Sequence, residues 1–324
     1  MDPHRSGPPP EPHPEDFTGW PSGWRAFLLA HGIPAESATW STRYVHGLAA
    51  YRLYMQDRLP EALGAAQAGL AQGLDRGGAW IANLANTIAA ELEARDSSRR
   101  LEHVPFIYEL PQDGPRYDRL TDLANRCAAK VEQVLGFRRP ATMFTLLAEG
   151  SLIRYTDSRY GYMAPKEPYF KICLPRPAPA DLSRTDSALV HEYTHVAVHT
   201  LSDWHTPRWV NEGLAQWMEE RVLDLETAGP LLPPGDHPHL GSVEARFHAH
   251  GDFGDFDPVR YAYDAALAAV RRLVAVHGEY DLRDFLARLA HESEGHAFGH
   301  TFGQSERRFE HEWHEQIERE ADGR

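Results

Sequence analysis

One short motif in this chain has the residue types and spacing to carry out chemistry, namely His191-Glu192-Tyr193-Thr194-His195. Two histidines four positions apart lie on one face of a helix, so both imidazoles can bind one ion. Catalytic Zn²⁺ sites use three protein ligands, with imidazole nitrogens at about 2.0–2.1 Å, and leave one position for water. Glu192, next to the first histidine, can take the proton of that water. The motif therefore predicts one zinc ion per chain.

A third zinc ligand is needed, and Glu212 is the best candidate. It lies 17 positions after His195, which lets the first helix end, the chain turn and a second helix pack antiparallel beside it. His199 continues the series along the first helix, but another turn puts it too far away for one ion to bond all three histidines. Asp203 and His205 could fold back and stay open as alternatives.

The segment Trp209-Val210-Asn211-Glu212-Gly213-Leu214-Ala215 makes a family resemblance visible. Together with HEYTH, it resembles the gluzincin zinc metallopeptidases of the thermolysin-like clan, and most of all the bacterial peptidase MA-like group. The resemblance covers about Leu101 to Ile317. It implies an α+β fold with a thermolysin-like zincin core, made of a small lobe with a mixed sheet and a helical lobe. It also implies that Glu212 is the third ligand.

The resemblance further implies a tyrosine or histidine that donates to the oxyanion. Tyr261 and Tyr263 both qualify, but they are about 200° apart on a helix, so only one can face the zinc. The spacing from Tyr263 to His277-Gly278, compared with the family's Tyr…Tyr-Gly pattern, favours Tyr263. Metal-bound histidines also need acceptors for their second ring nitrogen. Gln216 and Glu219 share the helix face of Glu212, and Glu219 is the better acceptor.

The predicted small lobe has three strands, and its edge should bind substrate. Period-two patterns predict strands at His103–Leu110, Thr142–Ala148 and Tyr169–Leu174. In gluzincins the strand before the HExxH helix forms the cleft edge that an extended peptide joins, which implies that role for Tyr169–Leu174. The aminopeptidase branch has a Gly-x-Met-Glu-Asn segment at this edge. Here the stretch reads Gly161-Tyr162-Met163-Ala164-Pro165-Lys166, which favours an endopeptidase.

Helical patterns complete the expected fold on both sides of the zinc motif. Helices are predicted upstream at Tyr117–Leu135 and downstream at Tyr261–Leu289, and Phe302–Trp313 resembles the family's closing segment. Leu223 to Pro258 has little periodicity and is predicted to be a long insertion. Its aspartates Asp252, Asp255 and Asp257 do not match the EF-hand calcium loop.

The chain divides into three predicted regions. Residues 1–16 are Pro-rich and are expected to be a disordered tail. Residues 17–99 form an all-α N-terminal lobe that is weakly tetratricopeptide-like, with no second copy at the repeat period. This lobe could dock a protein partner. Residues 100–324 form the metallopeptidase domain. The expected helices of the lobe are Thr42–Met55, Pro60–Leu74 and Ala79–Glu93.

Composition limits the partners and the compartment. A formal charge of −14 argues against nucleic acid and anionic membranes as partners. Two cysteines, Cys127 and Cys173, make no disulfide framework and fit a reducing compartment. No signal peptide and no apolar run of about 18 residues is evident, so the cytoplasm is the expected location.

These observations predict a zinc-dependent peptidase, favoured as an endopeptidase, that acts on a peptide or protein substrate. His191, His195 and Glu212 would hold the metal, Glu192 would be the general base and Tyr263 the oxyanion donor. One alternative is a peptidase-like binding or regulatory module with little or no proteolytic activity. Another is a zinc hydrolase that acts on a non-peptide amide.

Overall fold

The structure, a computed structural model, describes most of the chain after residue 41. The described residues are 42–71, 78–103, 106–111, 118–137, 141–147, 162–165, 169–175, 183–225, 232, 238–250 and 256–322. The predicted tail at residues 1–16 and the loop aspartates Asp252 and Asp255 lie outside them. The chain forms two compact units, Met1–Glu93 and Ala94–Arg324. This division lies a few residues before the boundary predicted between residues 99 and 100.

The N-terminal unit is helical in its described part. Helix α2 (Thr42–Met55) packs on α3 (Leu59–Leu70), and α4 (Gly78–Asp96) follows. Small side chains let α2 and α3 approach closely, since Ala50, Ala62 and Ala66 are all fully buried. The Tyr54 hydroxyl of α2 donates a hydrogen bond to the buried Glu91 carboxylate of α4. This bond joins the helical hairpin to the third helix.

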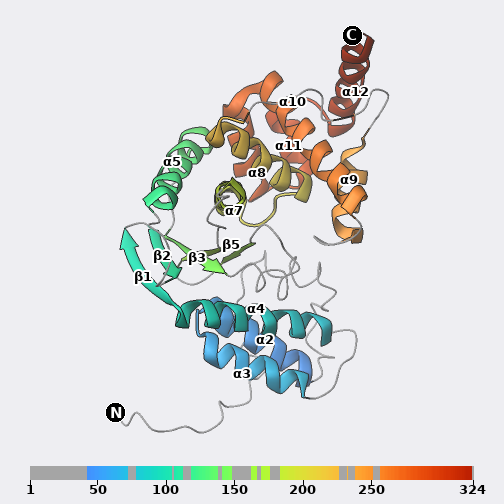
Figure 1. Ribbon diagram of the computed structural model, residues 1–324. Helices are drawn as coiled ribbons and strands as arrows, with labels where there is room; N and C mark the ends of the chain where they lie inside the picture. The colour runs from blue at the N-terminus through green and yellow to red at the C-terminus, as the bar shows by residue number, and fades with distance from the viewer. Residues whose placement is uncertain are drawn as a thin grey trace, which may run out of the picture. The chain divides into compact units, whose positions relative to one another are not determined.

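The second unit is α+β, and Figure 1 shows the strands β1, β2, β3 and β5 of its sheet. The described strands form one mixed sheet in the order β1-β2-β3-β5-β4. Antiparallel pairs β1–β2 and β4–β5 lie at the two edges, and the parallel pairs β2–β3 and β3–β5 lie between them. The strands are β1 (Ser98–His103), β2 (Phe106–Pro111), β3 (Thr142–Leu147), β4 (Tyr162–Pro165) and β5 (Phe170–Pro175).

The sheet corrects one prediction, because β5 is not the edge strand. β4 pairs with the outer side of β5 in the register Met163↔Ile172 and takes the edge position. With four residues and a terminal proline, β4 is too short for a period-two pattern to reveal it. β1 was also missed, because its sequence Ser-Arg-Arg-Leu-Glu-His is largely charged.

One face of the sheet forms the main core with α5 (Asp118–Leu135) and α7 (Ser183–Ser202). The segment His191–His195 takes part in this core through Tyr193, whose ring meets Phe106 edge-on and lies nearly parallel to Phe144. Tyr193 is fully buried and is about 200° from His191 around α7. The histidines are therefore directed away from the sheet. The other side chains on this sheet face are Tyr108, Leu110, Leu146, Ile172 and Leu174.

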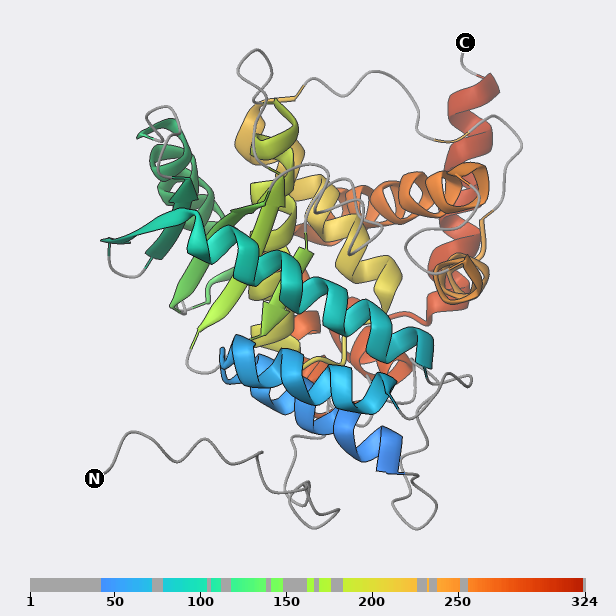
Figure 2. The same cartoon turned by 60° about the horizontal axis from the view of Figure 1, so that its bottom comes forward.

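The remaining helices form the C-terminal part of the unit (Figure 2). They are α8 (Arg208–Leu223), α9 (Leu240–His250), α10 (Phe256–Leu289), α11 (Glu294–Phe302) and α12 (Glu306–Asp322). Helix α10 is kinked at Gly278, whose φ of 84° is outside the helical region. Helix α9 lies inside the stretch 223–258, where little regular structure was expected. Leu240, Val243 and Phe247 bury its short apolar face.

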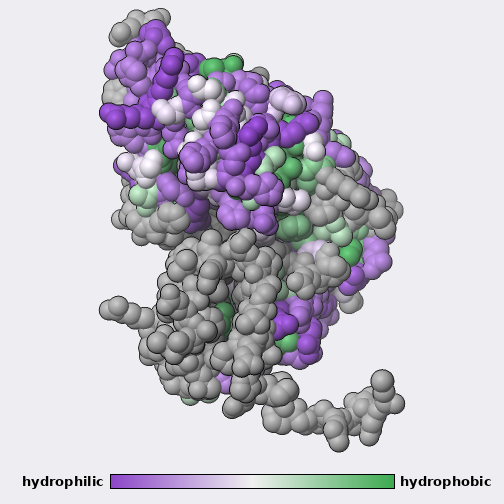
Figure 3. Space-filling model, turned by 180° about the vertical axis from the view of Figure 1, so that it is seen from behind, coloured by the Kyte–Doolittle hydropathy of each residue, from purple (hydrophilic) through white to green (hydrophobic). Residues whose placement is uncertain are grey.

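The described surface is polar over most of the face seen in Figure 3, and its apolar areas are small and separate. The large hydrophobic side chains exposed in the described residues are Leu225, Val276 and Tyr280. Among the described helices, none combines the length and apolar composition needed to cross a membrane.

The C-terminal end of α5 is fixed by an arginine from α10. Arg283 donates from Nη2 to the carbonyl oxygens of Gln133 and Val134, at 3.2 and 3.1 Å. The guanidinium lies so close to Gly136, where φ is +65°, that an added Cβ would lie 2.4 Å from it. Arg283 thus satisfies carbonyl groups that a helix end leaves without intrahelical partners.

We expect Arg283→Ala to reduce the free energy of unfolding by about 1–3 kcal/mol, because two hydrogen bonds from a charged donor are lost. Urea unfolding followed by circular dichroism would measure this. Arg260→Ala is the matched control, since Arg260 is on the same helix but its side chain is 78% exposed. Equal stability losses in both variants would contradict the capping role of Arg283.

Candidate metal centre

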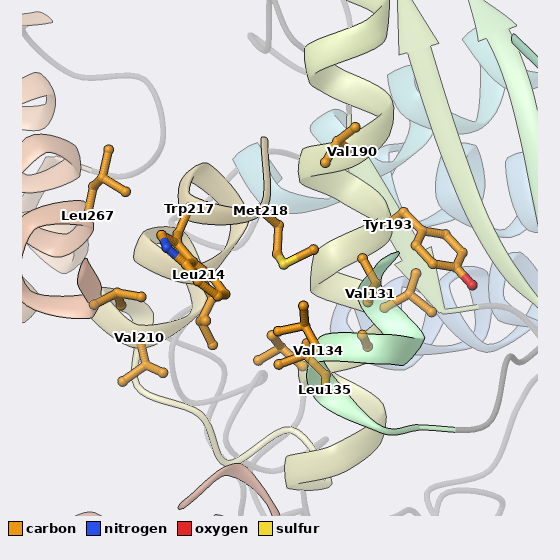
Figure 4. Packing of buried hydrophobic residues seen from close by; sticks show 14 of the residues in the cluster. Val131, Val134, Leu135, Val190, Tyr193, Val210, Leu214, Trp217, Met218 and Leu267 are labelled. Atoms are coloured by element: carbon orange, nitrogen blue, oxygen red, sulfur yellow. The ribbon is translucent and has the colours of Figure 1, made fainter. Parts of the chain in front are cut away.

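Helices α7 and α8 lie side by side and carry the predicted ligands. Hydrophobic residues hold α8 against its neighbours, and Figure 4 shows part of this cluster. Leu214 and Met218 of α8 are completely buried, as are Val190 of α7 and Val131 of α5. With its apolar side fixed in this way, α8 presents Glu212 to the histidines of α7.

The turn between α7 and α8 has an unusual backbone. Asp203 and Trp204 both have positive φ, at 47° and 67°, a conformation that costs energy in residues other than glycine. The Trp204 amide donates to the His199 carbonyl at 3.3 Å, and the two rings stack with centroids 4.0 Å apart. This turn reverses the chain so that α8 returns beside α7.

Three donor groups meet between the helices. Glu212 Oε2 lies 3.2 Å from His191 Nε2 and 3.7 Å from His195 Nε2. Donor atoms of all three residues lie within 4.8 Å of one another. Ligands at about 2.05 Å around a tetrahedral ion are about 3.3 Å apart. The described side chains therefore fit Zn²⁺ in number and type, and Glu212 lies at about this spacing from both histidines.

The Nδ1 ring nitrogens of both histidines also have hydrogen-bond partners. His191 Nδ1 donates to Glu219 Oε1 at 2.7 Å, which agrees with the helix spacing that singled out Glu219. His195 Nδ1 lies 2.9 Å from Asn211 Oδ1. Such acceptors fix the orientation of both rings and leave each Nε2 facing Glu212. Asn211 was not singled out from the sequence, although it directly precedes Glu212 in the segment that carries the resemblance.

The three rival ligands do not join this group. The His199 ring is stacked on Trp204. Asp203 and His205 are exposed, and His205 Nδ1 lies 3.3 Å from the Ser202 carbonyl oxygen. Among the described residues, only His191, His195 and Glu212 form a three-residue group that could hold a metal.

The predicted oxyanion tyrosine lies on α10, next to α8. Gln216 Nε2 donates to the Tyr263 carbonyl oxygen at 2.9 Å, and the Tyr263 ring meets Phe247 of α9 edge-on at 5.2 Å. The Tyr261 ring instead faces the Arg246 guanidinium at 4.5 Å. These contacts place the backbone of Tyr263 beside the helix that carries Glu212. The role of its hydroxyl stays a prediction.

The electrostatics of the site favour a cation. Burial by itself would raise the pKa of Glu212, but the two histidines hold it at about 2. Burial also opposes protonation of His191, yet its hydrogen bonds to Glu212 and Glu219 raise its pKa well above the usual value. Burial lowers the pKa of His195. In the absence of metal, a proton on His191 thus offsets the negative charge of Glu212 and Glu219. Binding of Zn²⁺ would displace that proton.

A glycine sets the distance between α8 and α10. A Cβ on Gly213 would lie 2.4 Å from the Ala266 carbonyl oxygen and 2.8 Å from Val270 Cγ2. Only a residue without a side chain allows this approach. Because Gly213 follows Glu212 directly, the same contact fixes the position of Glu212.

Two carboxylates hold the N-terminal end of α8. Glu244 of α9 accepts hydrogen bonds from the backbone amides of Arg208 and Trp209, at 3.2 and 3.0 Å. Glu294 of α11 accepts one from Trp209 Nε1 at 2.9 Å. Glu244 thus satisfies two free amides at the helix N-terminus, where a negative group also interacts favourably with the helix dipole. Both contacts lie within one turn of Glu212.

Comparison with known proteins adds no relative: no family model, no curated protein and no solved structure matches this chain.

Our first prediction for this site concerns the third ligand. Purified protein should bind about one zinc ion per chain, and Glu212→Gln should raise the dissociation constant for zinc more than roughly a hundredfold, since a charged ligand is lost. Competition with a chromogenic chelator would measure this. His205→Ala is the control and should bind zinc like the unchanged protein. Loss of zinc in the control, with retention in Glu212→Gln, would refute the assignment.

A second prediction concerns the pH dependence of stability. Burial, together with the nearby Glu306 and Glu244, raises the pKa of Glu294 to about 7, although its hydrogen bond from Trp209 acts in the opposite direction. In the folded state Glu294 therefore holds its proton longer than in the unfolded chain. Between about pH 4.5 and pH 7, its contribution to stability is lost as the pH rises.

Glu294→Gln should keep an acceptor for Trp209 and abolish this loss. Between pH 5 and pH 8, the variant should gain about 1–3 kcal/mol of unfolding free energy relative to the unchanged, metal-free protein. Glu102→Gln, which removes an exposed carboxylate of β1, should give no such gain. If the difference in unfolding free energy between Glu294→Gln and the unchanged protein stays constant across this range, the raised pKa of Glu294 is contradicted.

Proposed function

We propose that this protein is a zinc-dependent peptidase of the gluzincin type, with a thermolysin-like core and endopeptidase activity. The convergence of His191, His195 and Glu212 supports this proposal most strongly. Their three donor atoms come from two helices and lie within 4.8 Å of one another, and Glu192 directly follows the first histidine. A His₂Glu set with an adjacent glutamate matches the needs of metal-assisted hydrolysis.

Each residue around the site has its own role in the proposed hydrolysis. Zn²⁺, when bound, would polarise the scissile carbonyl and lower the pKa of water. Glu192, which is 7% exposed, takes the proton of the attacking water and delivers it to the leaving amine. Tyr263 donates its hydroxyl proton in a hydrogen bond to the oxyanion. Glu219 and Asn211 keep the two imidazoles in the orientation that directs Nε2 inward.

The strand β4 offers a place for substrate. It is the edge strand next to β5 among the described strands, and an extended peptide can add to such an edge through backbone hydrogen bonds. This strand lies within the stretch from Gly161 to Lys166, which lacks the aminopeptidase motif. At the position of the motif's glutamate, which would bind a free amine, stands Ala164. This difference favours cleavage within a peptide over removal of its first residue.

Glu192→Gln tests the proposed chemistry. The variant should keep its fold and bind zinc, because a non-ligand is changed, but lose roughly 10²–10⁴-fold in kcat, because the general base is missing. Cleavage of a diverse peptide library by the zinc-loaded protein would be followed by mass spectrometry, with a chelator-treated sample as the matched blank. Equal cleavage by the variant and the unchanged protein would favour a binding module instead.

A further inference from the structure

Helix α8, which carries Glu212, begins without a capping side chain of its own. Pro207 occupies the N-cap position and makes no side-chain hydrogen bond, and the first turn contains no acidic residue. Proline lacks the oxygen that a capping side chain uses to accept from the free amides. Glu244 of α9 supplies this acceptor instead. The start of α8 therefore depends on the position of α9.

Helix α9 begins in a similar way and is held by α12. It too has no acidic residue in its first turn. Its first backbone amide, that of Leu240, donates to Oε1 of Glu310 in α12 at 2.6 Å. The other oxygen of this carboxylate lies 3.4 Å from His239 Nδ1. Glu310 therefore supplies to α9 the acceptor that Glu244 supplies to α8.

A second residue of α12 adds to this contact. His314 is one helix turn after Glu310, and its Nε2 donates to the Pro238 carbonyl oxygen at 2.8 Å. The centroid of its ring lies 5.4 Å from that of His239. Two residues on one face of α12 thus hold the segment that leads into α9.

Aromatic packing fixes α12 in turn. The ring of Phe309 meets the ring of Phe298 in α11 edge-on, with centroids 5.7 Å apart. Phe309 and Trp313, one turn apart on α12, are both buried. Because Glu310 directly follows Phe309, this packing fixes the part of α12 that carries the carboxylate.

Helix α9 connects the two carboxylate contacts. It has 11 residues, and a helix of this length is marginal by itself. Its formation therefore depends on its cap and on its buried face, which contains Leu240, Val243 and Phe247. Glu244 is four positions after Leu240, so the contact with α12 and the contact with α8 are one turn apart. Loss of the first contact should therefore displace the second.

We infer that Glu310 is a positioning residue of the candidate metal centre, and that it acts through α9 and Glu244 on the helix that carries Glu212. The inference rests on the zinc centre of the proposed function. A helix end whose amides lose their acceptor opens more readily, and Glu212 is one turn from the start of α8. Opening of that turn would move its carboxylate away from the histidines. The affinity of the centre for zinc therefore depends on α12.

Competition for zinc between the full-length protein and a chromogenic chelator tests this inference. Glu310→Ala should raise the dissociation constant for zinc by roughly threefold to thirtyfold, the range expected for the loss of a helix cap. Glu310→Gln keeps an acceptor for the Leu240 amide and should restore most of the affinity. Glu315→Ala is the matched control on α12, where Glu315 is 49% exposed, and it should bind zinc like the unchanged protein. An unchanged dissociation constant in Glu310→Ala would overturn the inference.

A double-mutant cycle separates positioning through Glu244 from a general loss of stability. Glu244→Ala should also weaken zinc binding, because it removes the acceptor at the start of α8. If Glu310 acts through Glu244, adding Glu310→Ala to Glu244→Ala should change the dissociation constant by less than about twofold. Independent contributions would instead add in full, and that result would contradict the connection through α9.

Hydrogen exchange in the metal-free protein keeps the inference separate from the proposed function. Glu310→Ala should speed the exchange of the backbone amides in residues 208–214 by roughly threefold to thirtyfold, while the amides of β3 exchange as before. If the unchanged protein binds no zinc but this local increase is found, the proposed function fails and the connection from α12 to α8 stands. No increase in residues 208–214, or an equal increase in β3, would refute the role of Glu310.

Discussion

The carboxylate of Glu212, buried between two imidazoles, is the group on which the surrounding structure depends. A buried negative charge needs a positive partner, and here the partner is either a proton on His191 or a metal ion. Both helices must then stay at a fixed separation. Tyr193 holds α7 against the sheet, while Gly213 lets α8 lie directly against the backbone of α10. A larger residue at position 213 would shift the carboxylate away from the histidines.

Helix α10 supports the centre along much of its length. Ala266 meets Gly213, and the Tyr263 carbonyl accepts from Gln216, so two consecutive turns of α10 face the ligand-bearing part of α8. Further along, Arg271 pairs with Glu220 near the end of α8. The kink at Gly278 then changes the direction of the helix, and Arg283 closes the end of α5. One helix thus aligns both α5 and α8 with the sheet.

The structural features that depend on local periodicity could be predicted from the sequence. The positions of α5, α7 and α8 follow from apolar spacing. The grouping of His191, His195 and Glu212 follows from the one-turn spacing of the histidines and from a reversal of the chain between the two helices. Asn211 was missed because it is about 100° away from Glu212 on the helix, and its contact with His195 depends on how α7 and α8 pack together. Sheet order is a non-local property, so the edge position of β4 could not be read from its four residues.

The anchoring of α8 by later parts of the chain has a consequence for synthesis on the ribosome. The three residues of the candidate metal centre are complete once Glu212 has emerged, but the carboxyl groups that hold the start of α8 belong to Glu244 and Glu294. Gly213 likewise packs against Ala266, which is made later than the ligands. A nascent chain that ends after α8 therefore carries His191, His195 and Glu212, but the helix that bears Glu212 is not yet held in place. The three-residue group is therefore held in its final arrangement only when the C-terminal helices have folded around it.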